Sequence, residues 1–581
     1  MSIQRSLDLS LIKFPSVRFL AGLLRASVVS SILAAPIFTV KGDPPFHGRG
    51  EFFGDENIVV TESVYAGDAS LIIPGTTVLP NGALATADGS YPNVFNNESA
   101  DSSFGITAPI FLLELTRRGE VVNRLAVPTR LLTTSFSSKS ELAIHLSTEG
   151  AALTFMGYVA PVNTFDVSNS NTPGHFDPSN PVTTTYQRAV GLTDGRGDIW
   201  AKPVNAYSGN NGRAVILSNW IYYMVGNAGN GTLKGAQNIV DNTGVQIINA
   251  FWGSDSTVVG QQQGTVGDAK GYQYGYSVTQ NNYAPDNSGK DDNFRGETIF
   301  NRTLFVSKGS GSNGINTVYQ VGAAGMLPTF ASAATTQISI LPGFSTTLAK
   351  STTGTVYHPF GLFFANATTL YVADEGDGVL GNAASGNGGL QKWILVGSTW
   401  QLAYTLTAGL NLGQTYTVPG YPTGINPATG LAWAPAADGL RNIAGKVNRD
   451  GTVTIYGITS TVSGATDQGA DPNQLVVITD NLSFSSETDA AGEAFKTLRT
   501  AASGTVLRGV SFEPSEIPDP WRLNRKDSVQ NIVRRYRGGE PLAAPMDARA
   551  GQVFRCSGVG LFDVFERERP GGGYRLRVIK R

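Results

Sequence analysis

Short apolar runs separated by turn-forming residues dominate the middle of the chain, from residue 42 to residue 520. The runs span about four to eight residues, are rich in β-branched and aromatic side chains, and end at Gly, Asn, Asp or Pro. The 3.6-residue apolar period that is typical of amphipathic helices is missing from most of this region. The pattern predicts an all-β fold of the sandwich, barrel or propeller type.

Repetition of one strand pattern favours the propeller. The clearest copy has four runs, at 358–364, 369–374, 390–395 and 400–405. A second copy has runs at 440–447, 452–456, 474–478 and 495–498. Four strands in a meander make one propeller blade.

A third copy is split between the two ends of the middle region. Residues 506–512 read as an innermost strand with no second strand after it, and residues 57–62 read as a second strand with no first strand before it. The runs at 110–115 and 121–125 supply the third and fourth strands. We therefore predict that the late strand pairs with the early one and closes a ring, because closure removes exposed sheet edges.

The number of blades follows from the second strands. Candidates for these strands begin near Ile58, Leu153, Trp220, Leu304, Leu370 and Val453. The prediction is a six-bladed β-propeller, and seven blades is the alternative if residues 130–255 contain a further copy.

The stretch from His358 to Asp374 carries a family resemblance. Its Pro-x-Gly inner strand and its Leu-Tyr-Val-Ala-Asp second strand resemble blades of the NHL, YVTN and gluconolactonase-like propeller group, over residues 358–407. Glu375-Gly376-Asp377 departs from the usual continuation of such a blade. The resemblance implies a β-propeller but no single activity, because this fold hosts hydrolases, lyases and binding modules.

The ends of the chain differ from the middle in charge. Residues 1–41 contain five basic side chains and one acidic side chain, followed by small apolar residues around Ala34 and Ala35, which predicts a signal or targeting segment and an extracytoplasmic protein. A mobile N-terminus or an organelle presequence is the alternative. No apolar run approaches the roughly 20 residues that a membrane-spanning helix needs.

Residues 521–581 form a basic tail, with 14 basic and 6 acidic side chains, and residues 560–565 and 574–579 have strand patterns. The tail is either a basic arm that docks on an acidic partner, including another copy of the chain, or a flexible appendage. The middle region is acidic, and the whole chain has a net charge of −2, which argues against nucleic acid as a partner. One Cys excludes a disulfide framework.

Two acidic loops are candidate calcium sites. Asp374, Glu375 and Asp377 follow a predicted second strand, and the other group is Asp286, Asp291 and Asp292. Ca²⁺ binds six to eight oxygen atoms, which carboxylates and amide carbonyls supply. The alternative is turn formation, since Asp is common at strand ends.

Three further side chains are candidates for the central channel. His358 precedes an inner strand and is either a general base or a structural residue between blades. Arg441 and Arg508 occupy matched positions in Leu-Arg-Asn and Leu-Arg-Gly, where they either bind an anion or form ion pairs between blades.

Two functions fit these observations. The first is an exported binding or structural module whose loops bind glycan, protein or another copy of the chain. The second is a metal-dependent hydrolase of the lactonase or phosphoesterase kind, with a divalent cation held by carboxylates at the channel mouth. The chain lacks a Gly-x-Ser-x-Gly elbow, a His-Glu-x-x-His pair and a phosphate-binding P-loop, which favours the binding module.

Overall fold

The computed structural model describes most of the middle region and four short segments near the ends of the chain. The described residues are 52–54, 56–65, 75–78, 84, 105–136, 138, 141–232, 241–251, 253–260, 291–426, 429–464 and 469–514, together with the strand segments 38–40, 555–556, 560–569 and 573–580. The predicted targeting segment and tail therefore lie outside the described residues, apart from those strand segments. Asp286 also lies outside them.

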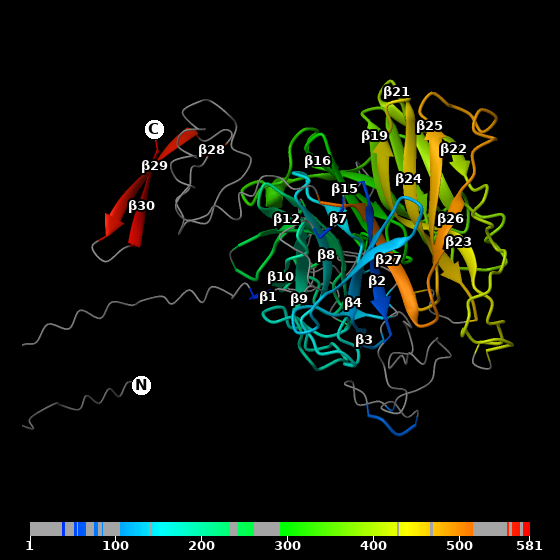
Figure 1. Cartoon of the computed structure of the whole chain (residues 1–581), viewed down its shortest axis with the longest axis horizontal. Helices are drawn as coiled ribbons and strands as arrows, with labels where there is room; N and C mark the ends of the chain where they lie inside the picture. Colours follow the sequence, from blue (N-terminus) through cyan, green and yellow to red (C-terminus); the bar gives the residue numbers. More distant parts are fainter. Residues whose placement is uncertain are drawn as a thin grey trace, which may run out of the picture. The chain divides into compact units, whose positions relative to one another are not determined.

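Six small antiparallel sheets form a six-bladed β-propeller, as the sequence predicts (Figure 1). We number the blades around the ring and give their strands from the innermost outward. Blade 1 consists of β27 (Thr505–Phe512), β2 (Ile58–Val64), β4 (Ile110–Leu115) and β5 (Val121–Ala126). Blade 2 consists of β7 (His145–Leu146), β8 (Ala152–Tyr158), β9 (Arg188–Asp194), β10 (Ile199–Val204) and β1 (Phe38–Val40). Blade 3 consists of β11 (Gly212–Ser218), β12 (Ile221–Gly226), β13 (Gly244–Asn249) and β14 (Thr257–Val259).

The other three blades follow in chain order. Blade 4 consists of β15 (Gly296–Phe300), β16 (Thr303–Lys308), β17 (Thr317–Val321) and β18 (Ile338–Ile340). Blade 5 consists of β19 (Pro359–Asn366), β20 (Thr369–Asp374), β21 (Gly389–Val396) and β22 (Thr399–Leu406). Blade 6 consists of β23 (Ala436–Val447), β24 (Thr452–Val462), β25 (Gln474–Asn481) and β26 (Lys496–Thr500). All six predicted second strands are second strands in the structure.

Three minor elements complete the description. They are a small pair formed by β3 (Thr107–Ala108) and β6 (Thr134–Ser135), a 3₁₀ turn at Ala333–Thr335, and a separate sheet of β28 (Arg555–Cys556), β29 (Gly560–Arg569) and β30 (Gly573–Lys580). The strands β29 and β30 correspond to the two strand patterns predicted in the tail. No helix in the described part of the chain is long and apolar enough to cross a membrane.

The ring closes where the sequence predicts. Strand β27 pairs antiparallel with β2, with Phe512 opposite Ile58 and Val510 opposite Val60. Figure 1 shows the two strands side by side, although more than 400 residues separate them in the chain. Gly509 lets β27 pack closely on blade 2, because a Cβ atom at this position would lie 2.4 Å from the backbone nitrogen of Ile144, just before β7.

The hydrophobic core lies between successive blades. The second strands are almost wholly buried, and in β8 and β20 this burial matches a nearly continuous apolar run. Each pair of neighbouring blades shares an apolar cluster; Val59 and Leu112 of blade 1, for example, pack with Leu153 and Phe155 of blade 2. The core is therefore a closed series of sheet-on-sheet contacts.

Candidate functional site

The long connections of the propeller gather at one end of its strands, which we call the loop face. First and second strands are joined at the other end by short turns, such as 219–220, 301–302 and 367–368. At 219–220 and 301–302 both turn residues have positive φ, as two-residue type I′ hairpins require. Second and third strands, by contrast, are joined at the loop face by segments such as 375–388, and blade 5 is joined to blade 6 there by 407–435. Long loops on a rigid scaffold are where binding residues concentrate.

Asp374 ends β20 at the loop face and is fully buried. Its carboxylate accepts hydrogen bonds from the backbone N–H of His358 (2.9 Å), the backbone N–H of Gly376 (3.0 Å) and the side-chain amide of Gln391 (3.1 Å). Burial raises the pKa of Asp374 to about 7. The predicted candidates Asp374 and His358 are thus in contact, and His358 contributes its backbone to that contact.

Glu375 binds Arg441 across the boundary between blades 5 and 6. The Nε of Arg441 donates to Oε2 of Glu375 at 3.0 Å, and both side chains are buried. Arg441 lies at a β-bulge in β23, where the register shifts between Leu440 and Ile443. A bulge redirects a side chain, which is how an inner-strand residue reaches the preceding blade. The ion-pair alternative for Arg441 matches this geometry.

Two more carboxylates lie close to this pair. Asp438, at the start of β23, is buried and accepts the N–H of Gly378 at 2.7 Å; burial, with repulsion from Asp377 and Glu375, raises its pKa to about 6. Asp377 is exposed and accepts the N–H of Val379 at 2.8 Å, a turn contact. No group of three or more His, Cys, Asp and Glu side chains in the described part of the chain is placed to hold a metal ion. The calcium site at Asp374, Glu375 and Asp377 stays a prediction.

The second predicted acidic group belongs to blade 4. Asp291 and Asp292 are fully buried just before β15, and the hydroxyl of Thr243 donates to Asp292 at 3.3 Å. Their third predicted partner, Asp286, is not among the described residues. The two acidic groups therefore share the loop face but come from different blades.

Arg508 binds the connection between blades 1 and 2. It lies in β27, where the register with β2 shifts between the partners of Val60 and Glu62. Its Nη1 donates to the backbone carbonyl of Ser138 at 2.5 Å, and its Nη2 donates to the backbone carbonyl of Phe136. Arg213 of blade 3 is an equivalent residue that sequence reasoning missed: it lies at a shift in β11 and donates to the carbonyl of Phe294. The signal was an Arg before a small residue at the start of an inner strand, which Arg213-Ala214 shares with Arg508-Gly509.

Sequence reasoning also missed an aromatic and acidic group at the loop face of blade 6. The hydroxyl of Tyr421 donates to Oδ1 of Asp471 at 2.5 Å, and its oxygen lies 2.8 Å from the hydroxyl of Ser463. Trp433, which is partly exposed, packs edge-on against the Tyr421 ring with centroids 5.8 Å apart. Burial raises the pKa of Asp471 to about 7. No motif marks these residues, because they lie in connections of irregular length.

Two polar atoms near this group are unsatisfied. Asp471 is fully buried and Arg441 nearly so, and their charges act on one another. Within the described residues, Oδ2 of Asp471 and Nη2 of Arg441 have no hydrogen-bond partner. A buried acceptor and a buried donor of this kind call for water or a ligand hydroxyl group. We call Trp433, Tyr421, Asp471 and Arg441 the blade 6 site.

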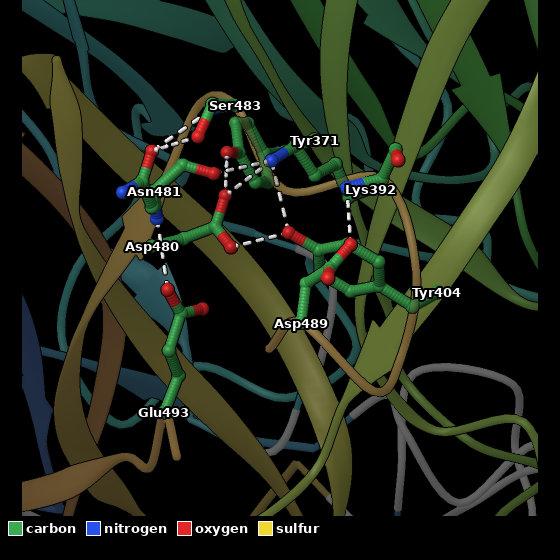
Figure 2. Close-up of polar contacts among 9 residues, drawn as sticks. Tyr371, Lys392, Tyr404, Asp480, Asn481, Ser483, Asp489 and Glu493 are labelled. Atoms are coloured by element: carbon green, nitrogen blue, oxygen red, sulfur yellow. Dashed lines mark hydrogen bonds and ion pairs between the residues drawn. The ribbon is translucent and has the colours of Figure 1, made fainter. Parts of the chain in front are cut away.

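A separate polar cluster locks blade 5 to blade 6 (Figure 2). The Nζ of Lys392, on β21, lies 2.9 Å from Oδ2 of Asp480, on β25, and both side chains are fully buried. The hydroxyls of Tyr371 and Tyr404 both donate to Asp480, and Lys392 donates to the Tyr404 oxygen at 2.9 Å. This cluster is inaccessible to a ligand and forms part of the interface between the blades.

Glu493 lies beside this cluster and accepts the backbone N–H of Asn481 at 2.8 Å (Figure 2). Partial burial, a hydrogen bond with Asp480 and repulsion from Asp480 raise the pKa of Glu493 to about 8. The raised pKa favours the protonated form of Glu493, which can donate to a neighbouring carboxylate.

No protein-family model matches the chain, and no curated protein matches it. An ulvan lyase of polysaccharide lyase family PL25, solved with a -[GlcA(1-4)Rha3S]- ligand, is 10% identical with a TM-score of 0.28, and the match covers 72% of this chain and 93% of that one. The N-terminal domain of Nup159 is 8% identical with a TM-score of 0.25, covering 79% and 97%. A mutant of the NanB sialidase from Streptococcus pneumoniae is 9% identical with a TM-score of 0.22, covering 77% and 78%. At these values none of them carries an argument about the function of this chain.

Proposed function

We propose that the chain is an exported β-propeller that binds an uncharged glycan at its loop face, through the blade 6 site. The observation that carries the proposal is a partly exposed Trp433 that packs on Tyr421, whose hydroxyl in turn donates to Asp471, a residue with an unsatisfied side-chain oxygen. Ligand sites in proteins combine aromatic surface with a few placed polar groups. A sugar suits both, because its ring presents an apolar C–H face and each hydroxyl group both donates and accepts.

The surrounding charges support a neutral sugar over an anionic one. The only cation at the site, among the described residues, is Arg441, and the Glu375 carboxylate pairs with it. Asp377 is exposed, and Asp438 and Asp471 add further acidic groups. Repulsion between like charges across an interface costs on the order of several kcal/mol. The carboxylates of the site would repel the anionic groups of sulfated or uronic-acid polymers, so these ligands are disfavoured.

The proposal of export rests on the N-terminal segment of the chain. Residues 1–41 have the basic and then apolar order of a signal segment. The test is cell fractionation of the full chain beside a variant that lacks residues 1–37, which keeps strand β1 of blade 2. Retention of both forms in the cytoplasm would contradict export without touching the glycan proposal.

The metal-dependent hydrolase is the alternative function. It requires carboxylates that are available to a cation, whereas Asp374 accepts three hydrogen bonds and Glu375 binds Arg441. These contacts favour the binding module. Metal analysis of the purified protein separates the two: stoichiometric Ca²⁺ whose removal abolishes a hydrolytic activity would overturn the binding module.

Glycan binding is tested with the full chain on an array of neutral and anionic oligosaccharides, followed by calorimetry with the best neutral ligand. Trp433→Ala should weaken binding roughly tenfold, which corresponds to about 1.4 kcal/mol. Trp220→Ala is the matched control, because Trp220 is also partly exposed and packs on an aromatic ring (Phe251, 5.0 Å) but lies in a turn at the opposite end of the strands. Binding only to anionic glycans, or equal losses in the two variants, would overturn the proposal.

A further inference from the structure

Lys308 is a buried lysine with an unusual set of neighbours. It ends β16 in blade 4 and is fully buried. Its Nζ donates to Oδ1 of the Asn316 side chain at 2.8 Å and to the backbone carbonyl of Ser310 at 3.1 Å. Both acceptors are uncharged oxygens. Lys392, the other fully buried lysine described above, has the carboxylate of Asp480 at 2.9 Å instead.

The environment of Lys308 makes the neutral amine accessible near neutral pH. An ammonium group is costly to bury without a carboxylate partner, so a buried lysine usually releases its proton. Burial and repulsion from Arg295 lower the pKa of Lys308 to about 7, although Asp291 and Asp292 oppose the shift. A neutral amine has a free electron pair and is a nucleophile.

Asn316 presents an electrophile to this amine. The hydrogen bond holds Nζ beside the side-chain amide of Asn316, itself 3% exposed, just before β17. The pairing of Lys308 with Thr317 across β16 and β17 fixes the two residues on neighbouring strands. Holding two reacting groups in contact replaces a bimolecular step by an intramolecular one, and burial excludes the water that would hydrolyse the amide.

We propose that Lys308 and Asn316 form an isopeptide bond that staples the 309–316 loop at the loop face of blade 4. The Nζ of neutral Lys308 attacks Cγ of Asn316, a C–N bond forms, and the bond from Cγ to Nδ2 breaks. The proton that Nζ loses passes to Nδ2, which leaves as ammonia. The product is a secondary amide, no oxidant or reductant is consumed, and the chain becomes lighter by one ammonia molecule.

A covalent staple of this kind suits the composition of the chain. The propeller contains no cysteine, since the only one is Cys556, so a disulfide is unavailable to fix its loops. The 309–316 loop contains Gly309, Gly311 and Gly314, which give it high conformational entropy when unfolded. Closing a loop with a covalent bond removes part of that entropy from the unfolded state.

Peptide mass spectrometry of the full chain tests the bond. Trypsin cuts after unmodified lysine, so a free Lys308 gives the separate peptides 303–308 and 309–350, because residues 309–349 contain no lysine or arginine. The isopeptide bond instead gives one uncleaved peptide, 303–350, that is lighter than its sequence by one ammonia. The same digest holds the matched control: cleavage after Lys392, which is equally buried but paired with a carboxylate, should be complete.

Two variants guard against a missed cleavage. Asn316→Ala should restore cleavage after Lys308, and Asn316→Asp should give the joined peptide with the loss shifted from ammonia to water. Complete cleavage after Lys308 in the unmodified chain, or an uncleaved 303–350 peptide of full mass, would overturn the proposal. Neither result depends on whether the protein binds a glycan.

Discussion

Replacing Asp480 by Asn tests whether the buried cluster of Figure 2 fastens blade 5 to blade 6. The substitution keeps the shape of the side chain but removes the charge that faces Lys392 at 2.9 Å. It also leaves the hydroxyls of Tyr371 and Tyr404 competing for one carbonyl oxygen, where the carboxylate accepts from both. We expect a lower free energy of unfolding.

The magnitude follows from burial. Both side chains of the pair are fully buried, and breaking such a pair by removing one partner costs about 3–5 kcal/mol, because the other charge stays behind without compensation. The double variant Lys392→Met with Asp480→Asn removes that uncompensated charge. Its loss should therefore fall short of the sum of the two single losses by about 1–3 kcal/mol.

The assay is urea unfolding at neutral pH followed by tryptophan fluorescence, since Trp393 and Trp400 are buried in blade 5. Glu56→Gln is the control: Glu56 pairs with Arg117 at 3.1 Å, a similar distance, but both side chains are exposed, so the loss should be about 1 kcal/mol or less. If Asp480→Asn costs no more than this control, or if the losses in the double variant simply add, the cluster does not fasten the blades as we argue.

Two further predictions concern pH and ring closure. The raised pKa of Glu493 means that folding favours its protonated form, so the stability that Glu493 contributes is present below pH 4.5, declines as the pH rises, and is lost above about pH 8. In Glu493→Gln, the midpoint of urea unfolding should therefore change less with pH over this range. An unchanged dependence of the midpoint on pH would show that other groups cause it. Gly509→Ala should lower the thermal unfolding temperature, because the added Cβ would lie 2.4 Å from the backbone nitrogen of Ile144. Gly381→Ala is the control, since its Cβ would meet nothing within 4 Å. Equal temperatures for the two variants would contradict the tight packing of β27 on the segment that leads into blade 2.

The fold was predictable because its determinants are local. A second strand buried on both faces must be a continuous apolar run, so β20 and β8 are visible in the sequence. The closure between β27 and β2 was predictable because the sequence contains one blade that lacks a first strand and one first strand that lacks a blade. Pairing the two completes the blade and removes two exposed sheet edges. Blade spacing is irregular, but this irregularity lies in the loops and leaves the strand pattern intact.

The polar groups were predictable only in part, because their partners are distant in sequence. Asp374 ends a recognisable strand, so the sequence indicates its position, but its partner Gln391 is 17 residues away. The partners Glu375 and Arg441 are 66 residues apart, and although an ion pair between blades is one prediction for Arg441, nothing in either local sequence identifies Glu375 as the partner. Lys308 and Asn316 are only eight residues apart, yet no pattern of residue types shows that both are buried.

The chain contains few charged residues, and the structure buries a notable share of them at the boundaries between blades. Apolar clusters shared by neighbouring sheets supply the packing at these boundaries. The ion pair of Arg441 with Glu375 and the hydrogen bonds from Arg508 to the blade 2 side are directional, and each is satisfied at one relative position of two blades. Arg441→Met removes one partner of a buried pair, so we expect a loss of stability of the same order as in Asp480→Asn, about 3–5 kcal/mol, together with a lower glycan affinity measured on the folded variant. A glycan affinity equal to that of the unmodified chain would show that Arg441 holds the two blades together but takes no part in the blade 6 site.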